Sequence, residues 1–139
     1  MNLFLDSSAL VKTLLSEQHS SVALRLWNEA AHHYVSRLTY VETRAALARA
    51  HRLGRLSEEG HVQAKAMLRA RLSRCEIVEV DAALVEAAGD LAQVHGLKGY
   101  DAVQLASALA VAVQDVLFAA WDRTLAEAGF AEGLTLATS

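Results

Sequence analysis

The feature that most constrains the fold is a regular alternation of short apolar runs with longer segments of helical periodicity. Each apolar run is followed by serine, threonine or aspartate, which favour the starts of helices. Short strands that alternate with helices form a parallel sheet with helices on both faces, and right-handed crossovers leave few topologies. We therefore predict an α/β fold, a three-layer α/β/α sandwich with a central, mainly parallel sheet.

The predicted strands cover residues 2–5, 33–36, 77–80, 116–120 and 134–137. The predicted helices follow Ser8 and then begin at Ser20 or Ser21, Thr39, Ser57, Asp81, Tyr100 and Asp122. Thr39 and Glu42 have the spacing of a capping box, and Gly54 is expected to end the helix that they open. Because no repeat or linker interrupts this order, we expect a single domain over residues 1–139.

Composition excludes several classes of protein. The chain is 53% hydrophobic and has no proline, so it is not a disordered or proline-rich chain. Its one cysteine, Cys75, excludes a disulfide framework and is expected to be an inert, half-buried thiol. No apolar stretch approaches the roughly 20 residues that span a membrane, and the N-terminus does not resemble a signal peptide. We therefore expect a cytoplasmic protein without a membrane partner.

The net charge of −3 conceals an uneven distribution. Residues 37–74 contain nine basic and three acidic side chains, whereas the rest of the chain has four basic and thirteen acidic ones. Such a chain can present a basic face beside an acidic pocket, and the local potential matters more to a partner than the net charge. Two solvated helix faces explain the pattern equally well.

Four acidic residues are expected at one edge of the sheet. Asp6 directly follows the first strand, and Asp122 follows the fourth. Glu42 lies one turn into the helix after the second strand, and Asp101 opens a later helix. Ligands of doubly wound sheets bind outside the carboxyl ends of the strands, which is where these residues belong. Each acid can also be explained structurally, as a helix cap or a charge in a first turn.

Carboxylates packed in a partly buried pocket repel one another, which raises their pKa values unless a cation compensates. Oxygen ligands without cysteine or clustered histidine suit Mg²⁺ or Mn²⁺ rather than zinc or copper. In phosphate chemistry such an ion can activate a water, orient the phosphodiester and stabilise the leaving oxygen. The four acids therefore indicate a candidate metal site, with one ion or two.

Four stretches of the chain form a recognisable series of motifs: Leu5–Lys12, Ser36–Glu42, Tyr100–Ala108 and Ala120–Ala126. Together they resemble the motifs of the PIN-domain ribonucleases, and most of all those of the VapC-type toxins of toxin–antitoxin pairs. The likeness covers essentially the whole chain, with the motifs in order. It implies a PIN-like sandwich and cleavage of RNA phosphodiester bonds that depends on Mg²⁺ or Mn²⁺.

The resemblance also implies roles for single residues. The residues that match the family's acidic quartet are Asp6, Glu42, Asp101 and Asp122. They would hold the metal, and one of them would orient or deprotonate the attacking water. Ser8 matches a small hydroxyl residue that bonds a carboxylate or a metal-bound water, and a helix-cap serine is its alternative. The implied partners are an RNA substrate, a cognate antitoxin that covers the pocket, and a second copy in a homodimer.

Two positions depart from the family pattern. Ala120 stands where serine or threonine is common, and Gln104 replaces a histidine often found three residues after the third acid. Neither change removes a proposed ligand. The two changes therefore concern the hydrogen bonds around the proposed ligands and how the site is adapted to its substrate.

Basic side chains recur at helical spacing on two consecutive predicted helices. The two stripes are His61–Lys65–Arg69 and Arg44–His51–Arg55. Arg44, Lys65 and Arg69 are candidate contacts to an RNA backbone or to acidic segments of an antitoxin, with ordinary helix surface as the alternative. Trp27 and Trp121 can stack on bases, but a place in the core or at an interface is the more common use of tryptophan.

Two other functions remain open at this point. A haloacid-dehalogenase-like phosphatase shares the doubly wound sheet, but its nucleophilic aspartate is followed two residues later by a second aspartate. Ser8 occupies that position here. A catalytically inactive PIN-fold binding module would not need all four acids. The sequence therefore favours the ribonuclease.

Overall fold

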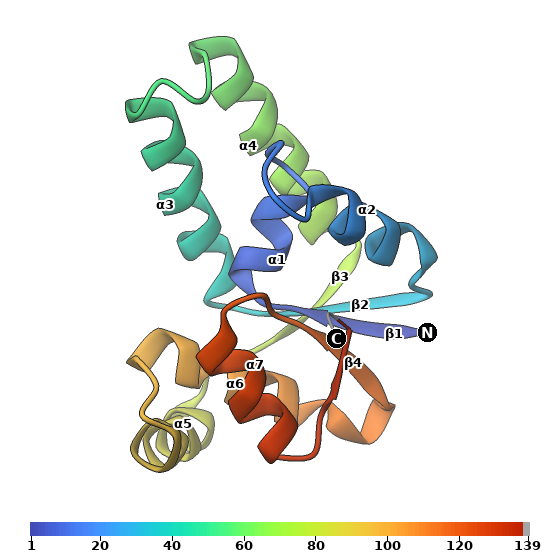
Figure 1. The fold of residues 1–139 in the computed structure, drawn as a ribbon, viewed down its shortest axis with the longest axis vertical. Coiled ribbons are helices and arrows are strands. Elements are labelled where there is room, and N and C mark those ends of the chain that lie inside the picture. The colour runs from blue at the N-terminus through green and yellow to red at the C-terminus, as the bar shows by residue number, and fades with distance from the viewer. Residues whose placement is uncertain (138–139) are drawn as a thin grey trace.

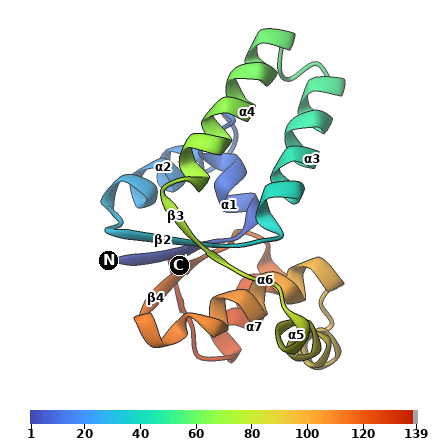
Figure 2. The same cartoon turned by 180° about the vertical axis from the view of Figure 1, so that it is seen from behind.

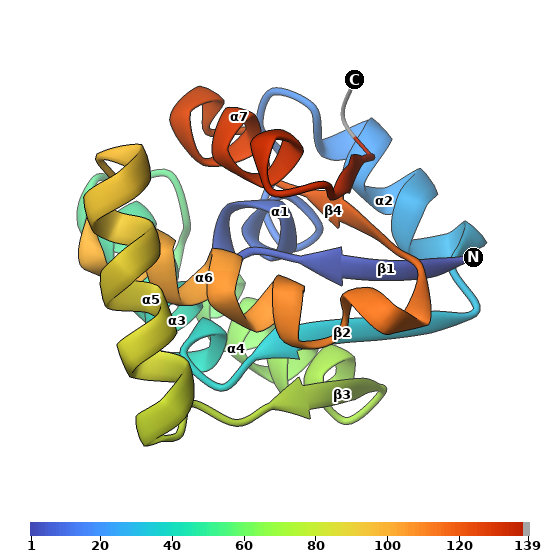
Figure 3. The ribbon, with the colours of Figure 1, turned by 90° about the horizontal axis from the view of Figure 1, so that it is seen from below.

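The computed structural model describes residues 1–137 and places five strands in one sheet, in the order β3-β2-β1-β4-β5. The strands are β1 (Asn2–Leu5), β2 (His32–Ser36), β3 (Cys75–Val78), β4 (Val116–Ala119) and β5 (Thr135–Leu136). All neighbours pair in parallel, and the strand arrows labelled in Figure 3 point in one direction. The predicted parallel sheet is confirmed.

Within residues 1–137, seven α-helices form the two outer layers. They are α1 (Ser7–Lys12), α2 (Ser20–Glu29), α3 (Thr39–Arg52), α4 (Glu58–Leu72), α5 (Ala82–His95), α6 (Gly99–Ala110) and α7 (Arg123–Ala131), and a short 3₁₀ turn, η1 (Ala112–Gln114), precedes β4. Helices α1 to α4 cover one face of the sheet and α5 to α7 cover the other, as Figures 1 and 2 show. The helices α3 and α4 form a hairpin that projects from the sandwich (Figure 1).

The central strand β1 is buried on both faces, which explains its continuous apolar sequence. Leu3 and Leu5 pack into the core beneath α1 to α4, whereas Phe4 points into the core beneath α5 to α7. Phe4 lies beside Phe118 of β4, with ring centroids 5.9 Å apart. Side chains that alternate between two cores fix the register of the strand, because a slip of one residue would exchange them.

The strand order reverses at β1. The chain leaves β1 for β2 on one side, and after β3 it returns across the sheet to β4 on the other side. The connections at this switch point lie on opposite faces and leave a crevice at the carboxyl ends of β1 and β4. The fold itself therefore places a cavity where the four acidic residues were expected.

Several helix ends differ from their predictions. Thr39 and Glu42 do not form a capping box, since Leu38 is the N-cap of α3 and makes no side-chain cap bond. The N-cap of α2 is His19, in a left-handed conformation, rather than Ser20 or Ser21. Strand β3 begins at Cys75, two residues earlier than expected. The predicted caps Ser57 and Asp81 and the stop at Gly54 are confirmed.

No helix within residues 1–137 is both long and apolar enough to cross a membrane.

One glycine is required by close packing. A Cβ atom on Gly129 of α7 would lie 2.7 Å from Cδ2 of the buried Phe118. We expect Gly129→Ala to lower the free energy of unfolding by about 1–3 kcal/mol, because the phenyl ring has little room to move. Gly89→Ala on the exposed side of α5 meets no atom within 4 Å and should stabilise the protein by up to about 1 kcal/mol. Urea unfolding of both variants checks this, and equal stabilities would contradict it.

Candidate active site

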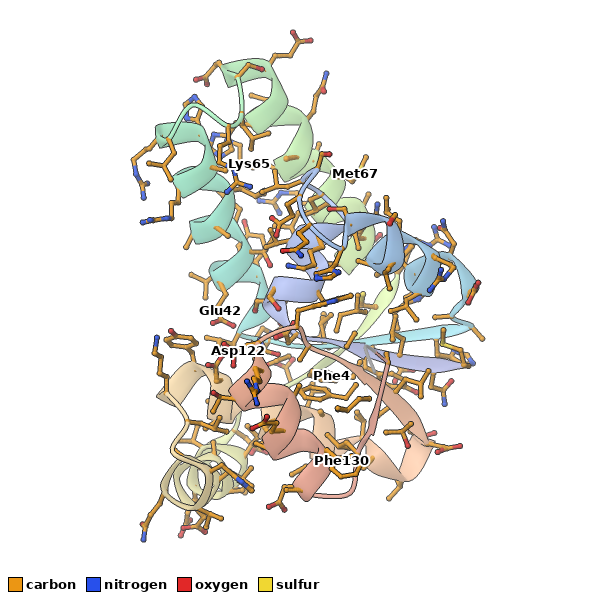
Figure 4. The ribbon with its side chains drawn as sticks, viewed as in Figure 1. Phe4, Glu42, Lys65, Met67, Asp122 and Phe130 are labelled. Carbon is orange, nitrogen blue, oxygen red and sulfur yellow. The ribbon has the colours of Figure 1, made fainter. Side chains whose placement is uncertain are left out.

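The four predicted acids line one cavity of about 480 Å³ at the carboxyl ends of β1 and β4. They are Asp6, Glu42, Asp101 and Asp122. Glu42 and Asp122, which come from opposite layers of the sandwich, lie at the same edge of the sheet in Figure 4. The structure thus confirms their convergence, while their roles as metal ligands stay a prediction.

Asp6 is both a structural cap and a cavity residue. It lies directly after β1 and is only 4% exposed. Its Oδ1 accepts a hydrogen bond from the backbone N–H of Ala9 at 2.8 Å, which caps α1, and another from Ser8 Oγ at 2.8 Å. Both bonds use the same oxygen, so Oδ2 receives neither of them. Ser8 therefore holds a carboxylate, one of the two contacts predicted for it.

Asp122, which follows β4, is likewise both a helix cap and a cavity residue. Its Oδ1 caps α7 by accepting from the N–H of Leu125 at 2.9 Å. Asp101 lies in the first turn of α6, where it accepts no side-chain hydrogen bond from any residue in the described part of the chain. The capping and catalytic explanations of these residues are therefore compatible, because one carboxylate oxygen is enough for a cap.

Glu42 is held by a buried polar network that the sequence did not reveal. Its Oε1 accepts from Ser7 Oγ and, at 2.8 Å, from Nε2 of Gln104. The same amide nitrogen is 2.9 Å from Ser7 Oγ and 3.0 Å from Thr39 Oγ1. Gln104 is 1% exposed, and its own carbonyl oxygen has no hydrogen-bond partner among the described residues, 1–137. The side chain thus ties α6 to the beginnings of α1 and α3.

The position of Gln104 is the signal that could have identified this network. It follows Asp101 by three residues on the same helix, so both side chains lie on one face of α6. The departure from the family's histidine was visible in the sequence, but its contacts were not. Thr39 was expected to open a helix and does begin α3, while Ser7 begins α1, and the hydroxyl groups of both also contact Gln104.

Burial and mutual repulsion raise the pKa values of the cavity acids. The pKa of Asp6 is raised to about 7, mainly by burial. The bonds from Ala9 and Ser8 oppose this rise, and the charges of Asp101 and Glu42 add to it. The pKa of Asp101 is raised by burial first and then by the charges of Asp122 and Glu42, while Lys98 lowers it. A cation in the cavity would offset both the cost of burying these charges and the repulsion between them.

The donor set fits a hard divalent cation in its chemistry. Carboxylate oxygens from four elements face one cavity, and Asp6 keeps one oxygen outside its cap bonds. Within residues 1–137, no three histidine, cysteine, aspartate or glutamate side chains are already arranged to hold a metal ion. The acids therefore form a cavity that can receive a cation rather than a closed chelating cluster.

The two basic stripes meet between α3 and α4. His51 and His61 stack with ring centroids 4.8 Å apart. Arg44 and Arg69 both bond the hydroxyl of Tyr40. Lys65, labelled in Figure 4, lies on the same hairpin. The stripes thus face each other across the hairpin, and their contacts to a partner stay a prediction.

The remaining predicted side chains have structural positions. Trp27 is buried and packs on His33 with centroids 3.9 Å apart, as expected of a core residue. Trp121 is half-buried, with His19 stacked on it and Lys12 over its ring. Burial raises the pKa of the Cys75 thiol to about 12, which makes it unreactive as predicted.

Residues 3–130 of this chain match the PIN domain family. The chain is also 41% identical over 134 residues to Ribonuclease VapC45 of Mycobacterium tuberculosis strain CDC 1551 / Oshkosh, and equally to Ribonuclease VapC49 of strain ATCC 25618 / H37Rv. Both alignments cover 96% of this chain and 93% of the relative.

Solved structures agree at the level of the fold. The toxin VapC20 of M. tuberculosis, described as cleaving the sarcin–ricin loop, superposes with a TM-score of 0.69 and 23% identity, over 91% of this chain and 95% of that one. The protein PAE2754 of Pyrobaculum aerophilum gives 0.67 and 23% identity, over 99% of this chain and 85% of that one. The protein described here belongs to the PIN domain family. Within that family its sequence is similar to the VapC ribonucleases.

The raised pKa of Asp6 predicts a pH-dependent stability in the metal-free protein. An aspartate that titrates near 3.8 when unfolded and near 7 when folded binds its proton more tightly in the folded state. The contribution of Asp6 to stability is therefore fully present below about pH 4 and is lost as the pH rises through about 7. Asp6→Asn keeps a capping oxygen and removes the charge, so it should flatten this fall, which is at most about 4 kcal/mol.

Urea unfolding with EDTA across this pH range measures the effect. Asp81→Asn is the matched control, because it makes the same change at the N-cap of α5, where Asp81 caps Leu84 and is not among the residues lining the acidic cavity. Identical pH profiles for wild type and Asp6→Asn would contradict the prediction.

Proposed function

We propose that this protein is a VapC-type ribonuclease, which hydrolyses RNA phosphodiester bonds at the acidic cavity and acts as the toxin of a toxin–antitoxin pair. The observation that carries the proposal is the convergence of Asp6, Glu42, Asp101 and Asp122 on one cavity. It occurs in a chain that is 41% identical to two ribonucleases over 96% of its length.

The four carboxylates would hold Mg²⁺ or Mn²⁺, with Asp6 and Asp101 as the leading ligands. A bound ion of this kind lowers the pKa of water and neutralises charge on a phosphate. The chain's own residues supply the placement. Ser8 and the N–H of Ala9 fix Oδ1 of Asp6, and Lys98 adds a positive charge to the cavity wall. A carboxylate not engaged in binding would accept the proton of the attacking water.

Gln104 has a positioning role in this proposal. With Ser7 it bonds Oε1 of Glu42, which leaves Oε2 outside these bonds. A carboxylate held by one oxygen presents the other in a fixed direction, which is how outer hydrogen bonds orient metal ligands. The histidine that is common in the family at this position is thus replaced by a side chain that still donates N–H bonds.

An antitoxin partner is proposed on the same grounds. Structural neighbours include a toxin–antitoxin complex from Klebsiella pneumoniae and VapBC2 from Rickettsia felis bound to a promoter DNA fragment. A ribonuclease inside a cell must be restrained, and an antitoxin over the cavity would do this. The homodimer belongs to the same proposal, and it is supported by apolar side chains exposed on α5, among them Val85 and Val94.

The first test is cleavage of RNA with Mg²⁺ or Mn²⁺. Asp101→Asn removes one charge from the cavity and should lower the cleavage rate more than about 100-fold, because a ligand affects activity at least as strongly as its outer partners do. Asp90→Asn on the exposed side of α5 is the matched control and should cleave like wild type. Activity that survives in Asp101→Asn, or in EDTA, would overturn the mechanism.

The second test concerns Gln104. Gln104→Leu removes the N–H donors and should raise the Mg²⁺ concentration for half-maximal cleavage by about 10- to 100-fold. Gln104→His restores a donor and should recover part of this loss. Ser107→Ala, on the same helix, removes only a bond to the carbonyl of Val103 and serves as the control. An unchanged Mg²⁺ requirement in Gln104→Leu would show that the network serves only the fold.

A further inference from the structure

Two arginines converge on one tyrosine outside the acidic cavity. Nη1 of Arg44 is 2.7 Å from the hydroxyl oxygen of Tyr40, and Nη2 of Arg69 is 3.2 Å from the same atom. Both guanidinium groups also lie over the Tyr40 ring, with their central carbons 5.7 Å and 5.6 Å from its centroid. One arginine comes from α3 and the other from α4, so the tertiary fold builds this arrangement.

The two positive charges have no counter-ion among residues 1–137. No ion pair formed among residues 1–137 includes Arg44 or Arg69. The neighbouring Arg37 is different, since Glu79 accepts two hydrogen bonds from its guanidinium. Like charges that share one hydrogen-bond acceptor repel each other, and an anion placed between them would offset that repulsion. Guanidinium groups bind phosphate and carboxylate through several parallel N–H bonds.

A cavity of about 300 Å³ opens beside this group. Tyr40 and Arg69 line it, together with Arg37 and apolar walls from Leu72 and Ile77. Arg44 does not line the cavity and reaches this group through its bond to the Tyr40 hydroxyl. The phenolic oxygen accepts from both arginines and still has its own proton to donate. An anion beside this hydroxyl, at the edge of the cavity, would therefore meet N–H donors from two arginines and an O–H donor from the tyrosine. We call Tyr40, Arg44 and Arg69 the arginine–tyrosine site.

The position of the site in the sheet indicates which anion it binds. Ser36 is the last residue of β2, and Ile77 pairs with Val35 one residue before β3 ends. The acidic cavity lies at the same edge of the sheet, at the carboxyl ends of β1 and β4. Strand β3 is two strand spacings from β1, about 10 Å. A chain running along this edge would reach both places.

We propose that the arginine–tyrosine site binds a backbone phosphate of the RNA strand whose scissile bond lies in the acidic cavity. The inference rests on the proposed ribonuclease function and adds a second contact point for its substrate. A phosphate rather than a protein carboxylate is assigned because the site continues the edge along which the substrate must lie. Because both arginines hold one phosphate, each alone should retain part of the contact.

Equilibrium binding in a cleavage-deficient protein tests the proposal. The probe is a short, mixed-sequence, single-stranded RNA labelled with fluorescein, bound to Asp101→Asn at a series of salt concentrations. Adding Arg44→Gln and Arg69→Gln together should weaken binding about tenfold or more. The slope of log affinity against log salt should become shallower by about 0.7, the value for one phosphate on a single strand. Tyr40→Phe keeps the ring, removes the hydroxyl, and should weaken binding by a smaller factor.

Arg49→Gln combined with Arg52→Gln is the matched control, since it removes the same two charges from the last turn of α3 and neither residue lines the cavity beside Tyr40. It should leave the salt slope closer to that of Asp101→Asn, and thermal melting should show that all variants fold. An equal effect of this control would overturn the proposal in favour of diffuse attraction. Loss of binding to an acidic peptide but not to RNA would overturn it in favour of a protein partner. If the wild type cleaves no RNA with Mg²⁺ or Mn²⁺, the ribonuclease function fails. If the wild type cleaves RNA but the double variant of Asp101→Asn binds with an unchanged slope, only the arginine–tyrosine site fails.

Discussion

The carboxylate of Asp6 is the point on which both the fold and the site depend. It follows the most deeply buried strand, and one of its oxygens begins α1 by bonding the N–H of Ala9. A charge in this position is unfavourable without compensation, as the pKa of about 7 shows. Asp6 therefore starts the first helix and also carries a buried charge that a bound cation would stabilise. Asp6→Asn separates the two roles, because it keeps a capping oxygen for Ala9 and removes the charge.

The other acids reach Asp6 through topology. Because the strand order reverses at β1, helices from opposite layers begin beside the same strand end. Glu42 comes from one layer and Asp101 from the other. Gln104, on the same helix as Asp101, connects the two layers through the hydrogen bond from its amide group to Glu42. The site is thus a junction between the layers. A change in the packing of α6 against the sheet would move Asp101 and release Glu42 together.

The sequence predicted what depends on periodicity and local caps, and missed what depends on contacts between layers. The parallel sheet, the caps Ser57 and Asp81, and the convergence of the four acids follow from spacing and from the rule for strand ends. The capping box at Thr39 was wrong because a tertiary partner, Gln104, uses the same side chains. The meeting of Arg44 and Arg69 at Tyr40 was equally invisible, since the angle between α3 and α4 decides it.

An acidic cavity repels the RNA that it must cut. The positive charge elsewhere along the same sheet edge offsets this repulsion. The net charge of −3 would by itself oppose nucleic acid, but the acids at the cavity and the arginines beside it are separated in space. A divalent cation would offset part of the negative potential at the cavity, while the arginine–tyrosine site is positive without one. Without the cation, the repulsion of the carboxylates would keep the scissile phosphate out of the cavity, even with its neighbour held by the arginines. Binding of the scissile phosphate in the cavity would therefore require the metal. The same ion would lower the repulsion that the substrate meets and supply the activated water.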